Sequence, residues 1–186
     1  MPDERRHNQW LNIETEFGPL VWQTVFRLLR THADALDCYQ DVMLEAFERS
    51  GSNAKPVENW PAYLKWLSVR RGLDRLRRAG RTSEQIDRGH DVADLAADCP
   101  PERPVELTEL KERLRRELTS LPERQATAFW LRFIEQMSYE EISEQLNVDA
   151  SAAGVLIHRA RIRVQKALAD PNPFTPETAD SIKANR

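Results

Sequence analysis

The chain has 186 residues, a formal net charge of −3 and a pI of about 5.9, which fits one domain or two small ones. Its overall charge does not indicate a nucleic-acid-binding protein, and its two cysteines are too few to predict a disulfide framework or a zinc site. The sequence has no apolar run of the roughly 20 residues that a membrane span needs and no apolar signal-peptide core, so we expect a cytoplasmic protein without membrane insertion.

The first fifty residues predict two helices. We expect residues 1–12 to be loosely held, with docking of Trp10, Leu11 and Ile13 on the following helices as the alternative. The first helix is expected to begin near Pro19, since proline is favoured in a first helical turn. The second helix, residues 33–49, is expected to bury Leu36, Tyr39, Met43, Ala46 and Phe47. Its other face carries Asp37, Asp41 and Glu45 four residues apart. Like charges at this spacing are mildly destabilising, so the stripe is either a solvated face or a surface for a basic partner.

A third helix is predicted from Trp60 to about Ala79, because Asn59-Trp60-Pro61 is typical of a helix start. Three aromatic residues in its first part precede six arginines against one acid between residues 69 and 81, a local charge of +5. Aromatic rings beside arginines suit a surface that stacks bases and holds phosphates. The alternative is that one or two of these aromatic side chains belong to the core.

Residues 82–104 are predicted to be an acidic linker with a local charge of −4, from six acids against two arginines. A helix is then expected to begin at Pro104 with Leu107, Leu110, Leu114 and Leu118 on one face. Another follows Leu121-Pro122 and adds Ala126, Phe129, Trp130 and Phe133 to the core. The tail beyond Asp170 is expected to be disordered.

Residues 138–168 have the spacing of a helix-turn-helix. Ser138 and Glu141 form a capping box at the start of a short helix, which ends at Asn147, and Val148 is expected to fill the corner. Asp149 is placed as the N-cap of a longer helix. That helix buries one stripe, formed by Ala153, Ile157, Ala160, Val164 and Leu168. Its other face is basic, so it predicts either a DNA-reading helix or a helical hairpin with a solvated face.

The two halves together resemble the sigma-70 family of bacterial RNA polymerase initiation factors, and specifically its small extracytoplasmic-function (ECF) type. The similar segments are HADALDCYQDVMLEAF (32–47), WPAYLKWLSVRRGLDRLRR (60–78), LPERQATAFWLRFIEQMSYEEISEQLNV (121–148) and HRAR (158–161). The resemblance implies an all-α protein of two small helical domains joined by a flexible linker. Region 2 would be residues 1–81, the linker 82–104, region 4 residues 105–169, and the tail 170–186.

The resemblance also implies partners and site residues. The clamp and flap of core RNA polymerase are the implied protein partners, with Asp37, Gln40, Asp41 and Glu45 on the clamp, and an anti-sigma factor is a possible further partner. The minus-ten promoter element would be recognised by Trp60, Tyr63, Trp66, Arg70, Arg71, Arg75, Arg77 and Arg78, with the loop 50–58 near a flipped base. The minus-thirty-five element would be read by Ser151, Ala152, Val155, His158, Arg159 and Arg163.

The recognition helix departs from the family pattern. Ala152, Gly154, Val155 and Leu156 stand where the family usually presents threonine, lysine, serine and arginine. Small apolar groups can touch thymine methyls but cannot make bidentate hydrogen bonds to bases. We therefore expect reading of the upstream element to depend on Ser151, His158, Arg159 and backbone contacts, or on DNA shape.

Three other functions are weighed against a sigma factor. One is a protein-interaction module that uses the apolar surface at Val155 and Leu156, and another is an ordinary helix-turn-helix regulator that binds DNA without polymerase. An enzyme is least favoured, because the sequence shows no catalytic or metal-ligand constellation and its four histidines are scattered. No cofactor, metal site or catalytic residue is expected.

Overall fold

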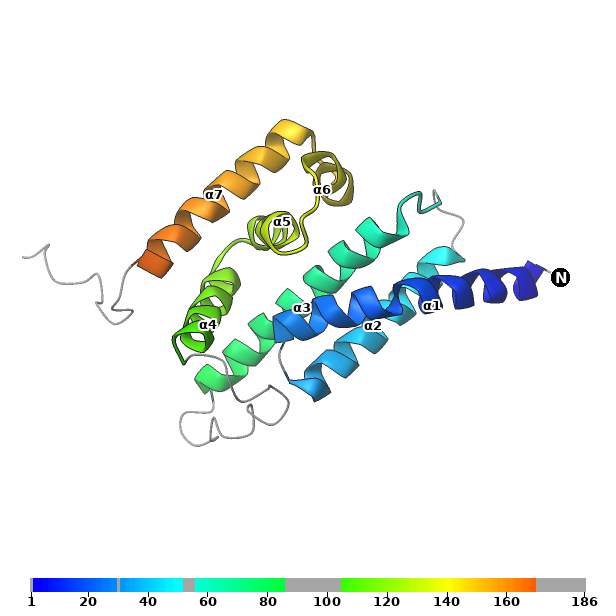
Figure 1. Ribbon diagram of the computed structural model, residues 1–186, viewed down its shortest axis with the longest axis horizontal. Coiled ribbons are helices and arrows are strands. Elements are labelled where there is room, and N and C mark those ends of the chain that lie inside the picture. The colour runs from blue at the N-terminus through cyan, green and yellow to red at the C-terminus, as the bar shows by residue number, and fades with distance from the viewer. Residues whose placement is uncertain (1, 30, 52–55, 86–104, 170–186) are drawn as a thin grey trace, which may run out of the picture.

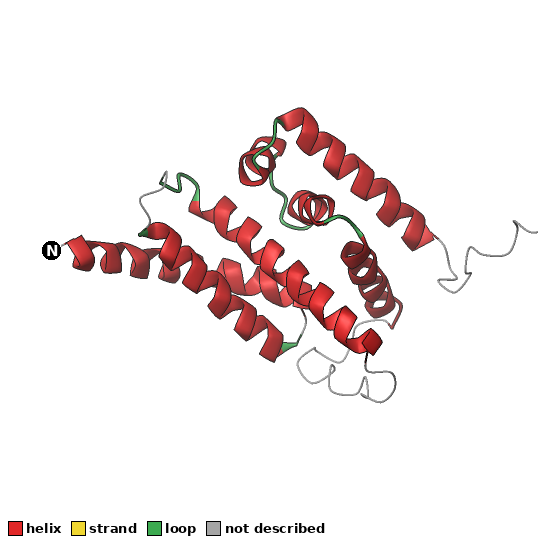
Figure 2. Ribbon diagram, turned by 180° about the vertical axis from the view of Figure 1, so that it is seen from behind, coloured by secondary structure: helices red, strands yellow, loops and turns green. Residues whose placement is uncertain are grey.

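The computed structural model describes residues 2–29, 31–51, 56–85 and 105–169, and every regular element in these ranges is a helix. Figures 1 and 2 show the helices from opposite sides. They are α1 (Pro2–Leu29), α2 (His32–Ser50), α3 (Trp60–Gln85), α4 (Val105–Ser120), α5 (Glu123–Phe133), α6 (Tyr139–Leu146) and α7 (Ala150–Ala169). The prediction of an all-α protein is confirmed.

Helix α1 begins far earlier than the sequence predicted. It runs through Pro19 without a break, so the predictions of a loose N-terminus and of a helix start near Pro19 are wrong. The reason is burial: Trp10 and Ile13 are 8% and 6% exposed, and the Trp10 ring meets the edge of the Phe47 ring with 5.5 Å between centroids. Apolar packing against α2 stabilises the helical conformation of these residues, so the helix extends toward the N-terminus.

Helices α1, α2 and α3 pack around one core, the predicted start of α3 at Asn59-Trp60-Pro61 is in place, and both α2 and α3 have N-caps. The Thr31 hydroxyl accepts a hydrogen bond from the Asp34 amide at 3.2 Å, and Asn59 Oδ1 accepts one from the Ala62 amide at 3.0 Å. The predicted burial of Leu36 is wrong, because this residue is 40% exposed. Helix α2 buries a neighbouring stripe instead, which consists of Ala35, Cys38, Val42, Met43 and Ala46.

Helices α4 to α7 form the second group, and its helix-turn-helix agrees with the predicted spacing. Ser138 and Glu141 make both hydrogen bonds of the capping box, and Asn147 ends α6 in the left-handed conformation with φ 50°. Asp149 Oδ1 accepts from the Ala152 amide at 2.7 Å, as an N-cap should. The predicted α7 stripe packs inward, whereas Leu110 and Phe133 are 43% and 38% exposed and so lie off the core.

The two groups of helices share a core, which the sequence did not predict. Leu28 of α1 and Ala62, Val69 and Leu73 of α3 belong to the same buried cluster as the core residues of α4 to α7. Figure 1 shows α3 between α1 and α2 on one side and α5 on the other. Gly72 permits a close crossing of α1 and α3, because a Cβ atom there would lie 2.5 Å from Leu28 Cδ2.

Two other predictions concern the ends of these groups. Helix α3 continues to Gln85, so the first residues of the predicted linker are helical, and residues 86–104 lie outside the described residues. The predicted disordered tail, residues 170–186, also lies outside them. Among the described helices, none combines the length and apolar character required to cross a membrane.

Candidate nucleic-acid interface

The acidic stripe of α2 and the arginines of α3 face each other. Arg75 contacts Asp41 at 2.6 Å and Asp37 at 3.7 Å, while Glu45 is paired with Arg71 and lies 3.6 Å from Arg70. The hydrogen bond to Glu45 raises the pKa of Arg71, although burial opposes the shift. Two sets of residues that the sequence assigned to different partners therefore neutralise each other within one helical bundle.

The carboxylates of the stripe remain accessible despite this pairing. The side chains of Asp37 and Asp41 are 66% and 54% exposed. Gln40 beside them is also exposed. Exposed ion pairs of this kind contribute only about 0–1 kcal/mol, so these carboxylates can exchange partners at little cost.

Two exposed leucines complete this surface of α2, and neither was predicted as part of it. Leu36 and Leu44 are 40% and 60% exposed and lie eight residues apart with Gln40 between them, which places all three on one side of the helix. We call Leu36, Asp37, Gln40, Asp41 and Leu44 the docking face. The four-residue spacing of positions 36, 40 and 44 is the sequence signal that could have revealed it.

The three aromatic side chains of α3 are partly buried, so each has one part in the core and another part exposed to solvent. Trp60, Tyr63 and Trp66 pack against the core formed by α1, α2 and α3. Tyr63 meets Trp60 edge to face at 5.8 Å and Trp66 at 5.6 Å, and the Arg70 guanidinium lies 5.4 Å from the Trp66 ring centroid. The alternative that these side chains belong to the core is thus partly met, while the stacking of bases on their exposed surface stays a prediction.

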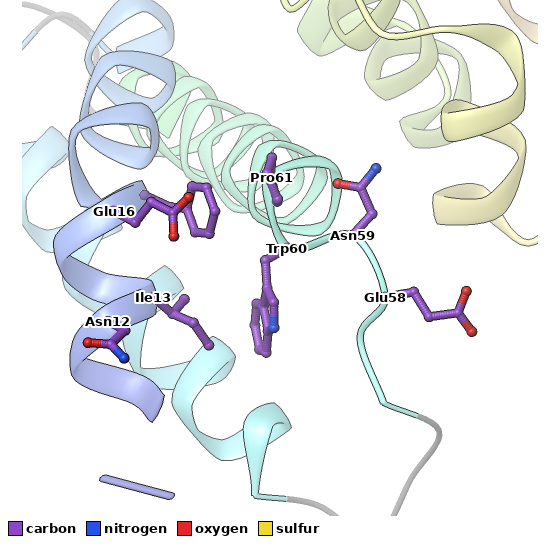
Figure 3. Close-up of a pocket in the computed structure, with 8 residues that line it drawn as sticks. Asn12, Ile13, Glu16, Glu58, Asn59, Trp60 and Pro61 are labelled. Carbon is purple, nitrogen blue, oxygen red and sulfur yellow. The ribbon is translucent and has the colours of Figure 1, made fainter. Parts of the chain in front are cut away.

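A pocket of about 490 Å³ lies beside Trp60, at the start of α3. Figure 3 shows residues of α1 on one side of this pocket and residues at the start of α3 on the other. The lining residues are Asn12, Ile13, Glu16, Phe17, Glu58, Asn59, Trp60 and Pro61. The pocket thus combines two aromatic residues with amide and carboxylate groups, and its volume lies within the usual range of about 300–1,000 Å³ for small-ligand sites.

The remaining α3 arginines make other contacts. Arg77 donates a hydrogen bond to the carbonyl oxygen of Leu121 at 3.2 Å, and Arg70 lies 4.0 Å from Glu123, so both reach the α4–α5 segment. Arg78 pairs with Asp74 of its own helix at 2.6 Å. Part of the predicted minus-ten surface therefore touches the second group of helices.

Most of the predicted residues on α7 form an outward face. Ser151, His158, Arg159 and Arg163 are exposed, Val155 is 45% exposed, and Ala152 is partly buried. Arg163 also lies 3.9 Å from Glu117 of α4. Sequence reasoning missed Ile162, which is 51% exposed on this side, and Tyr139, which lies under the Arg132 guanidinium at 4.9 Å. The face combines cationic groups with small apolar ones.

Comparisons with known proteins agree with this division. Residues 15–82 match the family model "Sigma-70 region 2", and residues 111–164 match "Sigma-70, region 4". The chain is 30% identical over 180 residues to the ECF RNA polymerase sigma factor SigE of Mycolicibacterium smegmatis, covering 95% of this chain and 68% of the relative. The chain belongs to the ECF sigma factors.

A second curated relative supports the assignment, and a solved structure shows the same fold. The ECF sigma factor SigW of Bacillus subtilis is 26% identical over 163 residues, which cover 81% of this chain and 83% of SigW. The fold is similar to that of the sigma factor RpoE of Bartonella quintana, crystallised with the anti-sigma factor NepR, with a TM-score of 0.55 and 20% identity over 87% of this chain and 99% of that one.

As an ECF sigma factor, the protein binds core RNA polymerase and directs promoter-specific transcription initiation. Family membership disfavours the alternative of a helix-turn-helix regulator that acts without polymerase, as well as that of an interaction module. Among the described residues, no three His, Cys, Asp or Glu side chains come together as a metal-binding group.

Proposed function

We propose that the docking face of α2 binds the clamp of the largest polymerase subunit. The observation that carries this proposal is the continuous exposure of two leucines, two carboxylates and one amide on a single side of the helix. Two exposed leucines beside a row of carboxylates suit a basic partner helix, because burial of the leucines supplies affinity while the carboxylates supply orientation. Glu45 is assigned a supporting role, since it is engaged by arginines of α3.

The minus-ten element is assigned to the start of α3 and to its arginines. A nucleobase displaced from the promoter would enter the pocket beside Trp60, with its ring face on the indole and its edge toward Asn12 or Asn59. Arg70, Arg71, Arg75, Arg77 and Arg78 would contact backbone phosphates. Their present partners are carboxylates and carbonyls, and a backbone phosphate offers arginine two anionic oxygens and a single negative charge, as a carboxylate does.

The minus-thirty-five element is assigned to the outward face of α7. Arg159, Arg163 and His158 would contact phosphates or base edges, Ser151 would bind near the helix start, and the Ala152 and Val155 side chains would touch thymine methyls. We further propose that the protein acts in the cytoplasm, where core polymerase is found, that it performs no reaction of its own, and that an anti-sigma factor regulates it, as NepR is named as the partner of the RpoE relative.

Run-off transcription with core polymerase on genomic fragments tests these assignments. We expect initiation at discrete sites that Asp41→Arg abolishes, because the new cation repels a basic partner. Asp74→Asn is the matched control, since Asp74 lies off the docking face on α3 and is 41% exposed. Initiation by the Asp41→Arg protein at the wild-type level would remove the docking assignment.

The upstream assignment has a separate test. Binding of the holoenzyme to a promoter duplex should weaken steeply with salt, and Arg159→Ala should reduce the slope of log affinity against log salt by about 1 if this side chain contacts a phosphate. An unchanged slope and affinity would show that the outward face of α7 does not contact promoter DNA through Arg159.

A further inference from the structure

The pocket beside Trp60 has a wall on α1 to which the sequence assigned no function. Four residues line the pocket from this helix: Asn12, Ile13, Glu16 and Phe17. They form two pairs with a spacing of four, so their side chains lie on one side of the helix. This wall exists because α1 continues to the N-terminus, where the buried Ile13 packs in the core formed with α2 and α3. A loose N-terminus would have left the pocket open on this side.

Glu16 is the charged group of the α1 wall. Its side chain is exposed. Figure 3 shows Glu16 extending from α1 toward the start of α3, whereas Glu58 on the other side points away from α1. A carboxylate accepts hydrogen bonds and donates none. Glu16 therefore offers the pocket a strong acceptor.

The other polar groups of the pocket strengthen this preference for a donor. The Oδ1 atom of Asn59 accepts a hydrogen bond from the Ala62 amide at 3.0 Å, so this acceptor is engaged in the cap of α3. Asn12 has an amide that both donates and accepts, so it does not select between ligands. None of the eight described residues that line the pocket is basic. A backbone phosphate is therefore disfavoured here, and an uncharged ring that donates hydrogen bonds is favoured.

The four bases of DNA differ in how well they meet a carboxylate. Cytosine, adenine and guanine each have an exocyclic amino group on the edge used for base pairing, and a single-stranded base exposes that edge. Carboxylates accept hydrogen bonds from such groups, as they do from cytosine N4. Thymine has carbonyl oxygens at both sides of this edge. A carbonyl oxygen that faces a carboxylate finds no donor and is repelled by the negative charge.

We propose that Glu16 makes this pocket selective for a displaced base with an exocyclic amino group and against thymine. The inference rests on the proposed function, in which a base displaced from the minus-ten element enters the pocket. The indole of Trp60 would stack on the base, and the Glu16 carboxylate would accept a hydrogen bond from the amino group. Helix α1 thus contributes a specificity-determining residue to promoter recognition, in addition to the residues of α3.

The test measures the affinity of the holoenzyme for a fork-junction DNA. Its sequence is that of the strongest promoter found by run-off transcription, and its non-template strand is single-stranded across the minus-ten element. Each position of this strand carries an abasic site in turn. The base that enters the pocket is the one whose removal costs less affinity in Trp60→Leu than in the wild type, because the ring that it contacts is already absent.

The amino groups of the same strand are then removed one at a time. Uracil replaces cytosine, purine replaces adenine and hypoxanthine replaces guanine. At the displaced base we expect the wild-type affinity to fall about tenfold, because a hydrogen bond to a charged group is lost. In Glu16→Gln the fall should be less than about twofold, since an amide can meet either a donor or an acceptor. Glu14→Gln is the matched control, because Glu14 lies on the same helix outside the pocket lining and should keep the wild-type response.

Three results would overturn the selection by Glu16. They are a thymine at the displaced position, an unchanged wild-type affinity after removal of its amino group, and an equal fall in the wild type and in Glu16→Gln. If no position responds to Trp60→Leu, the base does not enter the pocket and the proposed function of the pocket falls as well. A responding position without amino selection refutes the selection alone.

Circular dichroism of each variant checks that the helices are retained. Trp60 is partly buried, so its replacement carries the greater risk for the fold, whereas Glu16 is exposed. Because amino groups are removed at every position that has one, the comparison of the wild type with Glu16→Gln decides the selection even if Trp60→Leu loses its helices.

Discussion

Replacement of both leucines on the docking face, as Leu36→Gln with Leu44→Gln, should weaken polymerase binding without unfolding the protein. Glutamine is a good helix former of similar length, so α2 should persist. The leucines are 40% and 60% exposed, which together amounts to about one leucine side chain open to a partner. Complete burial of one leucine contributes about 1.5–3 kcal/mol, which corresponds to a loss of about 12- to 150-fold in affinity for core polymerase.

The assay is a titration of labelled core polymerase at fixed salt, with thermal melting of the sigma factor alone beside it. Leu110→Gln is the control, because Leu110 is 43% exposed on α4 and lies outside the docking face. We expect the double variant to melt within a few degrees of the wild type. Wild-type affinity in the double variant would refute the reasoning, as would an equal loss in Leu110→Gln.

Three further predictions concern stability and thiol chemistry. Gly154→Ala should raise the free energy of unfolding by up to about 1 kcal/mol, because alanine favours helix and its Cβ would lie at an ordinary contact distance of 3.8 Å from Tyr139. Gly72→Ala should lower the free energy of unfolding, measured in urea, by about 1–3 kcal/mol, because its Cβ would clash with the buried Leu28 side chain. Ser138→Ala removes one half of the capping box and should lower the free energy of unfolding by about 1 kcal/mol in the same measurement. Burial raises the pKa of Cys38 from 9.0 to about 11, so the thiol should resist alkylation at pH 8 in the native protein.

The Cys38 shift also has a consequence for stability. Since the folded pKa is raised, its contribution is fully present below pH 9 and is lost as the pH rises toward 11. The loss is about 1.4 kcal/mol per pH unit across that window, measured as the wild type minus Cys38→Ala difference in urea unfolding. A difference that stays constant from pH 8.5 to 11 would contradict this, just as equal melting of the two glycine variants would contradict the packing argument at Gly72.

Local rules were enough to predict much of the fold. The capping box at Ser138, the left-handed Asn147 and the Asp149 cap depend on hydrogen bonds between residues three or four positions apart, so the sequence alone specifies them. The α7 stripe was also predictable, because its period is that of the helix itself. The start of α1 was not, since it depends on Trp10 meeting Phe47 of another helix.

The candidate site divides in the same way. The acidic stripe and the arginine cluster were visible as charge patterns, but the pairing of Arg75 with Asp41, 34 residues away, was not. The exposure of Leu36 and Leu44 was not predicted, because an apolar residue next to the buried face of a helix is normally expected to be buried.

By itself the sequence determined that the chain is helical, where most helices begin and end, and that it has two halves similar to those of a sigma factor, because these follow from short-range periodicity, caps and segment similarity. Only the tertiary structure decided that the halves share one core and that Arg115 and Glu135 are buried between them. The physical reason is that burial of a charged side chain depends on carbonyls and hydroxyls supplied by residues about 90 to 110 positions away, and no local pattern encodes that meeting.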